Sequence, residues 1–124
     1  MTNTILIGLA GLAGTLLRYW IAEFVTRRSG ETFPWGTLVV NIVGCLLAGA
    51  IFSLTENRLL ISPAFRTVIL VGLLGGFTTF SAYGLQTFML LRDGQIAMAT
   101  LNVVVSNVVG ILMVWVGYGL VRVL

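Results

Sequence analysis

The residues best suited to chemistry form one segment, Gly75-Gly76-Phe77-Thr78-Thr79-Phe80-Ser81, in the middle of a long apolar run. Glycine costs about 1 kcal/mol per helical position, so this cluster predicts a break in a helix. In a membrane, the freed carbonyls cannot face lipid and must line a protein-buried or water-filled site. Broken helices in transporters use such carbonyls to bind cations and helix N-termini to hold anions. A closely packed glycine hinge is the alternative interpretation.

Aromatic side chains follow the predicted break on one helix face. Phe80, Tyr83 and Thr87 are spaced at i, i+3 and i+7, which places them on one side of a helix. The positive edge of an aromatic ring can contact a small anion, where a full positive charge would hold it too tightly. Asn41, in another apolar run, adds an amide donor. Ordinary packing is the alternative role for these aromatic residues.

The elements that must position these residues are membrane-spanning helices. Hydrophobic residues make up 58% of the 124-residue chain and charged residues 9%, and mean hydropathy is +1.06. A span needs roughly 20 helical residues, and each of four apolar runs is long enough: 3–25, 35–54, 64–91 and 95–123. No alternating pattern suggests a barrel. We therefore predict a single all-α integral membrane domain whose third helix, about 42 Å if continuous, is broken near residues 75–79.

The composition also excludes several classes of function. Histidine is absent, Cys45 is the sole cysteine, and the sequence offers neither paired carboxylates nor a nucleophile–base arrangement, so we expect no enzyme. The N-terminus lacks a basic region and an obvious cleavage site, so the first run is expected to be a true span. The net charge of +3 comes from scattered arginines, which does not suggest nucleic-acid binding.

The arginines give almost no preference for one orientation in the membrane. With four spans, one end of the bundle carries Arg58, Arg66 and Arg122, and the other carries Arg27, Arg28 and Arg92, with Arg18 one to two turns inside. The positive-inside rule then gives little net bias. Insertion in both orientations predicts an antiparallel homodimer. An orientation set by some other signal is the alternative.

Stripes of small and polar residues at three- and four-residue spacing favour close helix packing in lipid. They run along the first, second and fourth spans: Gly8, Gly11, Thr15, Arg18 and Ala22; Thr37, Asn41, Gly44 and Ala48; Asn102, Ser106 and Gly110. Packing within the chain explains each stripe. A four-helix monomer is nevertheless too small to enclose a pathway and shield so many polar positions, which again favours a dimer.

Two motifs together resemble the Fluc (CrcB) family of fluoride channels. They are Gly36-Thr37-Leu38 followed by Asn41 and Gly44, and the Gly75–Ser81 segment. The resemblance covers almost the whole chain, including the length, the four spans and Arg18 at the end of the first stripe. It implies a dual-topology antiparallel homodimer that exports fluoride passively through the bacterial inner membrane, with two fluoride pores and one central sodium ion.

The resemblance also assigns residues. By similarity, the backbone carbonyls of Gly75 and Thr78 from both subunits coordinate the sodium ion. Phe80 matches the first pore phenylalanine, Asn41 the pore asparagine, and Ser106 a hydroxyl on a polar track in the fourth helix. Thr37 and Arg18 belong to the same expected fluoride pathway. Gly110 lacks the hydroxyl that some relatives carry one turn further along.

One position departs from the family pattern. Tyr83 stands where a second pore phenylalanine is expected. Its ring still offers an edge, and its hydroxyl adds a hydrogen-bond donor and acceptor beside the expected fluoride path. We expect this hydroxyl to alter ion occupancy or conductance.

Arg18 and Glu23 are the charged residues nearest membrane depth. Arg18 either concentrates anions at a vestibule or snorkels to the interface. A small multidrug-resistance-type exporter is the strongest rival, because it is also a four-span, dual-topology dimer. It needs a carboxylate deep in the first helix, where this chain has no acid before Glu23. A purely structural membrane subunit is a second rival, but it would need neither the break nor the polar stripes.

Overall fold

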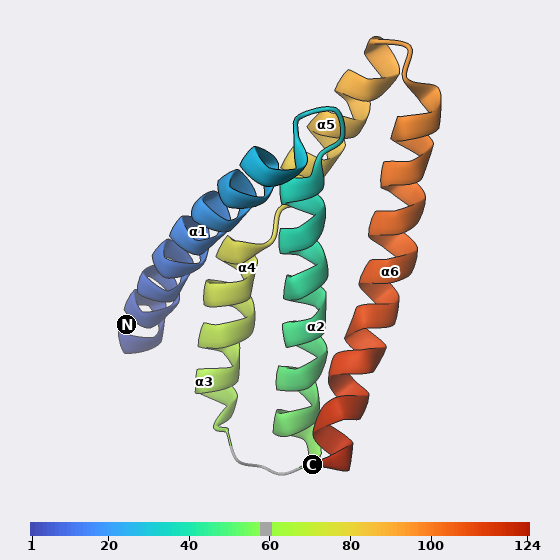
Figure 1. The fold of residues 1–124 in the computed structure, drawn as a ribbon. Helices are drawn as coiled ribbons and strands as arrows, with labels where there is room; N and C mark the ends of the chain where they lie inside the picture. The colour runs from blue at the N-terminus through green and yellow to red at the C-terminus, as the bar shows by residue number, and fades with distance from the viewer. Residues whose placement is uncertain (58–60) are drawn as a thin grey trace.

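The computed structural model describes residues 1–57 and 61–124, and these contain helices and no strand. Three long helices are α1 (Thr2–Ser29), α2 (Trp35–Asn57) and α6 (Ile96–Val123). The third span, Pro63–Arg92, is divided into α3 (Pro63–Thr67), the π-helix η1 (Val68–Leu74), α4 (Gly75–Phe77) and α5 (Phe80–Arg92) (Figure 1). All four spans are long and apolar enough to cross a membrane. The predicted all-helical architecture with a broken third helix is confirmed.

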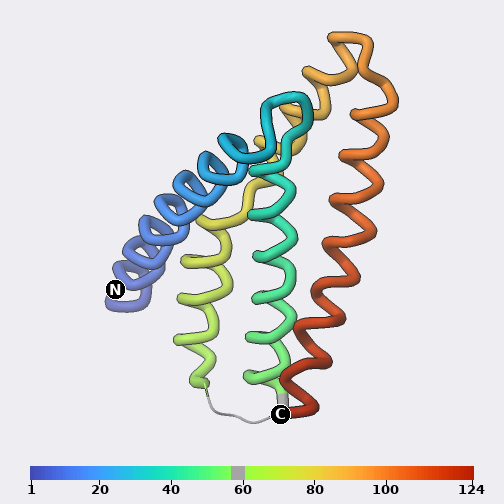
Figure 2. The backbone as a smooth tube through the Cα atoms, viewed as in Figure 1, coloured from blue at the N-terminus to red at the C-terminus, as the bar shows by residue number. Residues whose placement is uncertain are grey.

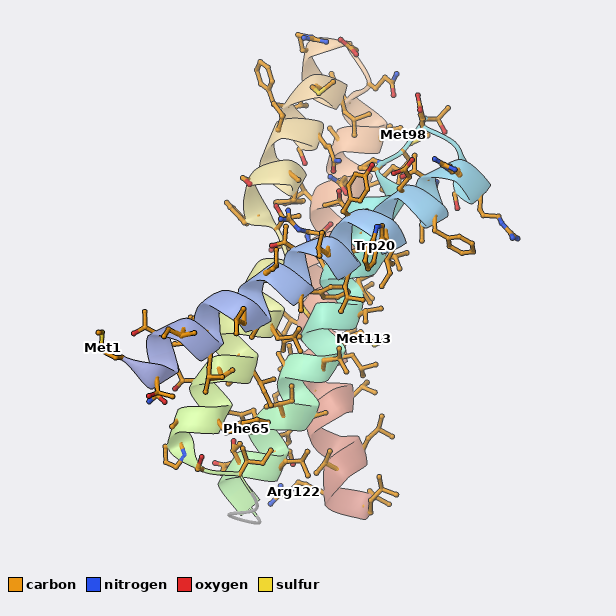
Figure 3. The ribbon with its side chains drawn as sticks, turned by 90° about the vertical axis from the view of Figure 1, so that its left-hand side faces the viewer. Met1, Trp20, Phe65, Met98, Met113 and Arg122 are labelled. Atoms are coloured by element: carbon orange, nitrogen blue, oxygen red, sulfur yellow. The ribbon has the colours of Figure 1, made fainter. Side chains whose placement is uncertain are left out.

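The spans form two packed pairs. α2 and α6 lie side by side and run in the same direction, whereas α1 crosses η1 and α4 at a steep angle (Figures 1 and 3). α5 leaves the line of α3–α4 and packs on α6. Arg122 and Phe65 lie near one end of the bundle and Met98 near the other (Figure 3). Arg58, counted among the arginines of the first end, lies outside the described residues.

Glycines let the paired helices approach until their backbones touch. A β-carbon at Gly117 would overlap the carbonyl oxygen of Leu46, and one at Gly14 would overlap that of Leu73. Gly76 meets the Gly11 carbonyl in the same way. Such contacts are typical of helix association in lipid. Gly8, the first residue of the predicted stripe on the first span, instead faces open space.

The break itself consists of Thr78 and Thr79, whose backbones are extended at φ −86°, ψ 160° and φ −151°, ψ 116°. Figure 2 shows this segment as the short link of tube without a helical coil between the two halves of the third span. Gly75 remains helical, at φ −61°, ψ −38°. The break was predicted in the correct segment, but the glycines do not unwind. Gly72 and Gly76 serve close packing against α1, and the β-branched threonines supply the extended turn.

The connections at one end of the bundle use residues with positive φ. Gly30 (φ 85°) ends α1, and Gly94 (φ 76°) follows α5. At the other end, the Ser62 hydroxyl caps α3 by accepting a hydrogen bond from the Phe65 amide at 3.2 Å. These local signals place the connections between the spans outside the apolar runs.

Most of the helical surface is exposed and apolar. Only 6% of the best apolar window in α1 is buried, and 17% in both α6 and the third span. Exposed leucines, valines and aromatic residues occur in all four spans. This surface suits hydrocarbon solvent, and the chain is a multi-pass membrane protein.

Candidate functional site

Asn41 on α2 holds the break open. Its side-chain nitrogen donates to the Thr79 carbonyl at 3.1 Å, and its side-chain oxygen accepts from the Thr79 N–H at 2.9 Å. One side chain therefore satisfies both backbone groups of an extended residue inside the span, which would otherwise be costly in lipid. The amide nitrogen has two N–H groups, and the Thr79 carbonyl uses one of them.

Two backbone carbonyls at the break lack their usual helical donors. In a continuous helix the N–H of residue i+4 bonds the carbonyl of residue i. The Thr79 N–H, the usual donor to Gly75, is bound to Asn41 instead. The Ala82 N–H, the usual donor to Thr78, is bound to the Thr79 hydroxyl at 3.2 Å. The carbonyls of Gly75 and Thr78 therefore lose their ordinary partners.

The Leu74 carbonyl behaves differently, because it accepts from both the amide and the hydroxyl of Thr78 at 2.9 Å. The released carbonyls lie at the C-terminal, partly negative end of one half-helix. Half-helix ends and unwound carbonyls are the groups that coordinate sodium in membrane transporters. The carbonyls of Gly75 and Thr78 are therefore candidate ligands for a cation.

A cavity of about 400 Å³ opens at the break, and we call it the break cavity. Six of the residues predicted for the site line it: Asn41, Gly75, Thr78, Phe80, Tyr83 and Ser106. The rings of Phe80 and Tyr83 lie 5.5 Å apart between centroids and are inclined by 49°. Phe80 is 82% exposed in the single chain, so the cavity is open on the side of this ring.

A polar network ties α5 to α6 beside the break cavity. The Thr87 hydroxyl donates to the Tyr83 carbonyl at 2.8 Å and accepts from the Asn102 amide at 2.9 Å. Asn102 is 2% exposed. Its side-chain oxygen accepts a long, 3.4 Å hydrogen bond from Ser106. The predicted stripe on the fourth span thus packs inward, and only Ser106 reaches the cavity as well.

Asn107, which was not predicted, also lines the break cavity. Its side-chain nitrogen donates to the Tyr83 hydroxyl at 3.2 Å. The signal for this contact was present in the sequence, because a tyrosine hydroxyl inside a membrane needs a polar partner. The partner itself required knowledge of how α5 packs on α6.

Arg18 and Thr37 lie apart from the break cavity. They line a second cavity of about 630 Å³, the Arg18 cavity, together with Gln86. The Nε of Arg18 and the Oε1 of Gln86 are buried and lack a hydrogen-bond partner among the described residues. The eight residues predicted for the site therefore do not form one cluster: six line the break cavity, and Arg18 and Thr37 line the other. Thr79 lines both cavities and stands between them.

The carboxylate nearest membrane depth is already engaged. Glu23 forms a salt bridge with Arg27, one turn along α1. A proton-coupled exporter needs a free carboxylate that binds protons in exchange for its cationic substrate. Among residues 1–57 and 61–124, no cluster of histidine, cysteine and carboxylate residues is arranged to hold a metal ion. The polar chemistry near the break comes from amides, hydroxyls and backbone carbonyls.

Comparison with known proteins agrees with the motifs. Residues 5–118 match the family model described as "CrcB-like protein, Camphor Resistance (CrcB)". A protein of Opitutus terrae is 45% identical over 95% of this chain and 91% of its own length. Relatives in Methylobacillus flagellatus (42% identical; 98% of this chain and 96% of its own length) and Citrifermentans bemidjiense (40%; 100% and 100%) match over even larger shares. All three are named "Fluoride-specific ion channel FluC". The resemblance seen in the sequence is confirmed: the chain belongs to the CrcB (Fluc) family.

Proposed function

We propose that the chain forms a passive, fluoride-selective channel that exports fluoride across the bacterial inner membrane. The observation that carries the proposal is the break cavity, which lies at the middle of a membrane span and is lined by aromatic rings together with amide and hydroxyl groups. Its relatives of nearly full length are named as fluoride-specific channels. Fluoride is a small anion with a strong demand for hydrogen-bond donors, and this cavity provides them without a full positive charge.

The Arg18 cavity serves as the entrance to this path. Arg18 raises the local concentration of anions, and its buried Nε supplies a donor that no described residue uses. Thr37 lines the same entrance. From there an ion passes Thr79 to reach Asn41, Phe80, Tyr83 and Ser106 in the break cavity. Charge at the entrance and neutral donors inside allow the ion to enter and also to leave.

A second, inverted copy of the chain completes the pore. Phe80 and Asn107 are exposed in the single chain, and an exposed amide at membrane depth is costly in lipid. A partner packed over these residues encloses the open side of the cavity. Two copies give two break cavities and hence two pores. The near balance of arginines between the two ends allows both orientations to insert.

A sodium ion sits where the two breaks meet, held by the Gly75 and Thr78 carbonyls of both copies. The release of these carbonyls from their usual donors supports this site. The ion supplies positive charge that offsets the convergence of four carbonyl dipoles. It is a structural ion and takes no part in transport.

Reconstitution into liposomes tests the function directly. Vesicles loaded with fluoride or with chloride are diluted, and efflux is followed with ion-selective electrodes. We expect rapid fluoride efflux and no chloride efflux above that of empty liposomes. Well-folded protein that releases no fluoride, or that exchanges cationic drugs for protons, would overturn the proposal.

The same assay tests the sodium site. Protein purified and assayed with N-methylglucamine in place of sodium should lose flux and unfold at lower temperature, because a ligand that binds only the folded dimer stabilises it. Returning sodium should restore both properties, and potassium should restore less. An unfolding temperature independent of sodium would count against the ion.

A further inference from the structure

The side chain of Asn107 is oriented by a hydrogen bond to its own helix as well as by Tyr83. Its side-chain nitrogen donates to the Val103 carbonyl at 2.8 Å and to the Tyr83 hydroxyl at 3.2 Å. The backbone carbonyl fixes which end of the amide is nitrogen, because a flipped amide would set two oxygens against each other. Both N–H groups of Asn107 are then in use.

This arrangement determines the role of the Tyr83 hydroxyl. Because an amide nitrogen accepts no hydrogen bond, the hydroxyl oxygen is the acceptor in this contact and its proton points elsewhere. Tyr83 and Asn107 both line the break cavity. A hydroxyl that accepts a hydrogen bond also becomes a better donor. Asn107 therefore both turns and polarises the Tyr83 O–H.

The backbone of Tyr83 is held independently of Asn107. Its carbonyl accepts from Thr87, which is bound in turn to the buried Asn102 of α6. The position of α5 on α6 therefore does not depend on the Asn107 contact. Loss of Asn107 is expected to free the hydroxyl without moving the helix.

We propose that Asn107 is a positioning residue that directs the Tyr83 O–H into the break cavity as a hydrogen-bond donor to the permeating anion. This inference rests on the proposed channel function and adds a determinant of how tightly the ion is held. A hydrogen bond to an anion is stronger than one between neutral groups. The pair therefore lowers the fluoride concentration at half-maximal flux and slows release of the ion.

A double-mutant cycle tests the pair. Fluoride efflux is measured against fluoride concentration for the parent, Asn107→Leu, Tyr83→Phe and the double variant, with Val108→Ala as an exposed apolar control on the same helix. Asn107→Leu should raise both the half-saturating concentration and the maximal flux by about two- to fivefold, the effect of one hydrogen bond. In the Tyr83→Phe background the same substitution should change neither quantity. If the leucine variant forms no stable dimer, Asn107→Ala replaces it in the cycle.

Other outcomes contradict the pair. Equal effects of Asn107→Leu in both backgrounds would mean that Asn107 acts through packing alone. No effect in the parent background would mean that the hydroxyl needs no positioning. If the parent conducts fluoride but the effects of the two substitutions are independent, this inference is overturned and the proposed channel function stands. A parent without fluoride flux overturns both.

Discussion

At the scale of single residues, the break depends on side chains that replace backbone partners. Asn41 bonds both backbone groups of Thr79, and the Thr79 hydroxyl takes the amide of Ala82. These side-chain bonds leave the carbonyls of Gly75 and Thr78, which both line the break cavity, without their usual helical donors. Polar side chains thus create the site in two ways: they line it, and they free the backbone groups beside it.

Asn41→Ala removes both hydrogen bonds to Thr79 at once. The Thr79 N–H is then left without a partner inside the span, which costs about 1–3 kcal/mol. We expect the free energy of unfolding, measured by SDS titration, to fall by that amount and fluoride flux to fall with it. Val43→Ala, an exposed position two residues along α2, serves as the control. Equal free energies of unfolding for Asn41→Ala and Val43→Ala would refute the role of Asn41 in bonding Thr79.

Tyr83→Phe should raise fluoride flux in liposomes by about two- to fivefold, the equivalent of one hydrogen bond. The reason is that in the proposed channel the phenol hydroxyl would hold the ion in the break cavity, whereas a phenylalanine edge would hold it weakly. The aromatic packing on Phe80 does not involve the hydroxyl, so the fold should persist. Equal or lower flux from the phenylalanine protein would show that the hydroxyl does not slow permeation.

At the scale of helices, glycine contacts decide how closely the spans pair. Gly14 touches the backbone of Leu73, so the position of α1 fixes the half of the third span that precedes the break. Leu73 belongs to the π-helix η1, so this contact fixes η1 against α1. Packing against α1 therefore determines where the released carbonyls point.

Gly14→Ala and Gly8→Ala form a matched pair on α1. A β-carbon at Gly14 overlaps backbone atoms, whereas one at Gly8 meets open space. We expect Gly14→Ala to destabilise the protein by about 1–3 kcal/mol through overpacking. Gly8→Ala should be neutral or slightly stabilising, because alanine is the better helix former. SDS titration with the flux assay distinguishes them, and equal stabilities would contradict the close contact.

At the scale of the whole molecule, the proposed antiparallel dimer depends on the balance of arginines between the two ends. Ser29→Arg with Thr32→Arg adds charge at one end, and Thr2→Arg with Asn3→Arg adds it at the other. Each variant should insert in a single orientation. Expressed alone, each should give little fluoride flux, because an antiparallel dimer needs both orientations.

Co-expression of the two oppositely biased variants should restore flux and produce mixed dimers, which differently tagged copies would reveal on co-purification. Thiol labelling of a cysteine placed at the C-terminus reports the orientation of each. Full activity from either variant alone would contradict the antiparallel dimer.

Much of the fold was predictable because it rests on local properties. Hydropathy and length predict four spans, and the Gly75–Ser81 segment predicts the break. The extended residues were not predictable as Thr78 and Thr79, because the nearby Gly76 is packed against Gly11 of α1, a contact between distant segments. Local propensity favours unwinding at the glycines, and tertiary packing overrides it.

The site was predictable to the same extent. Residues near the break or on facing stripes come together in the break cavity. Arg18 and Thr37 line a separate cavity, and Arg18 lies on α1, which crosses η1 and α4 at a steep angle. The partner of Tyr83 depended on the register between α5 and α6, which the sequence does not reveal.

Thr79 carries more separate demands than any neighbour considered above. Its amide and carbonyl are bound to Asn41, its hydroxyl caps α5, and it borders both cavities. In terms of mutational tolerance, serine alone keeps the hydroxyl at a similar size, whereas valine keeps the shape and loses the cap. A substitution of Thr79 by a residue without a hydroxyl is therefore expected to disturb the fold and the proposed ion path together.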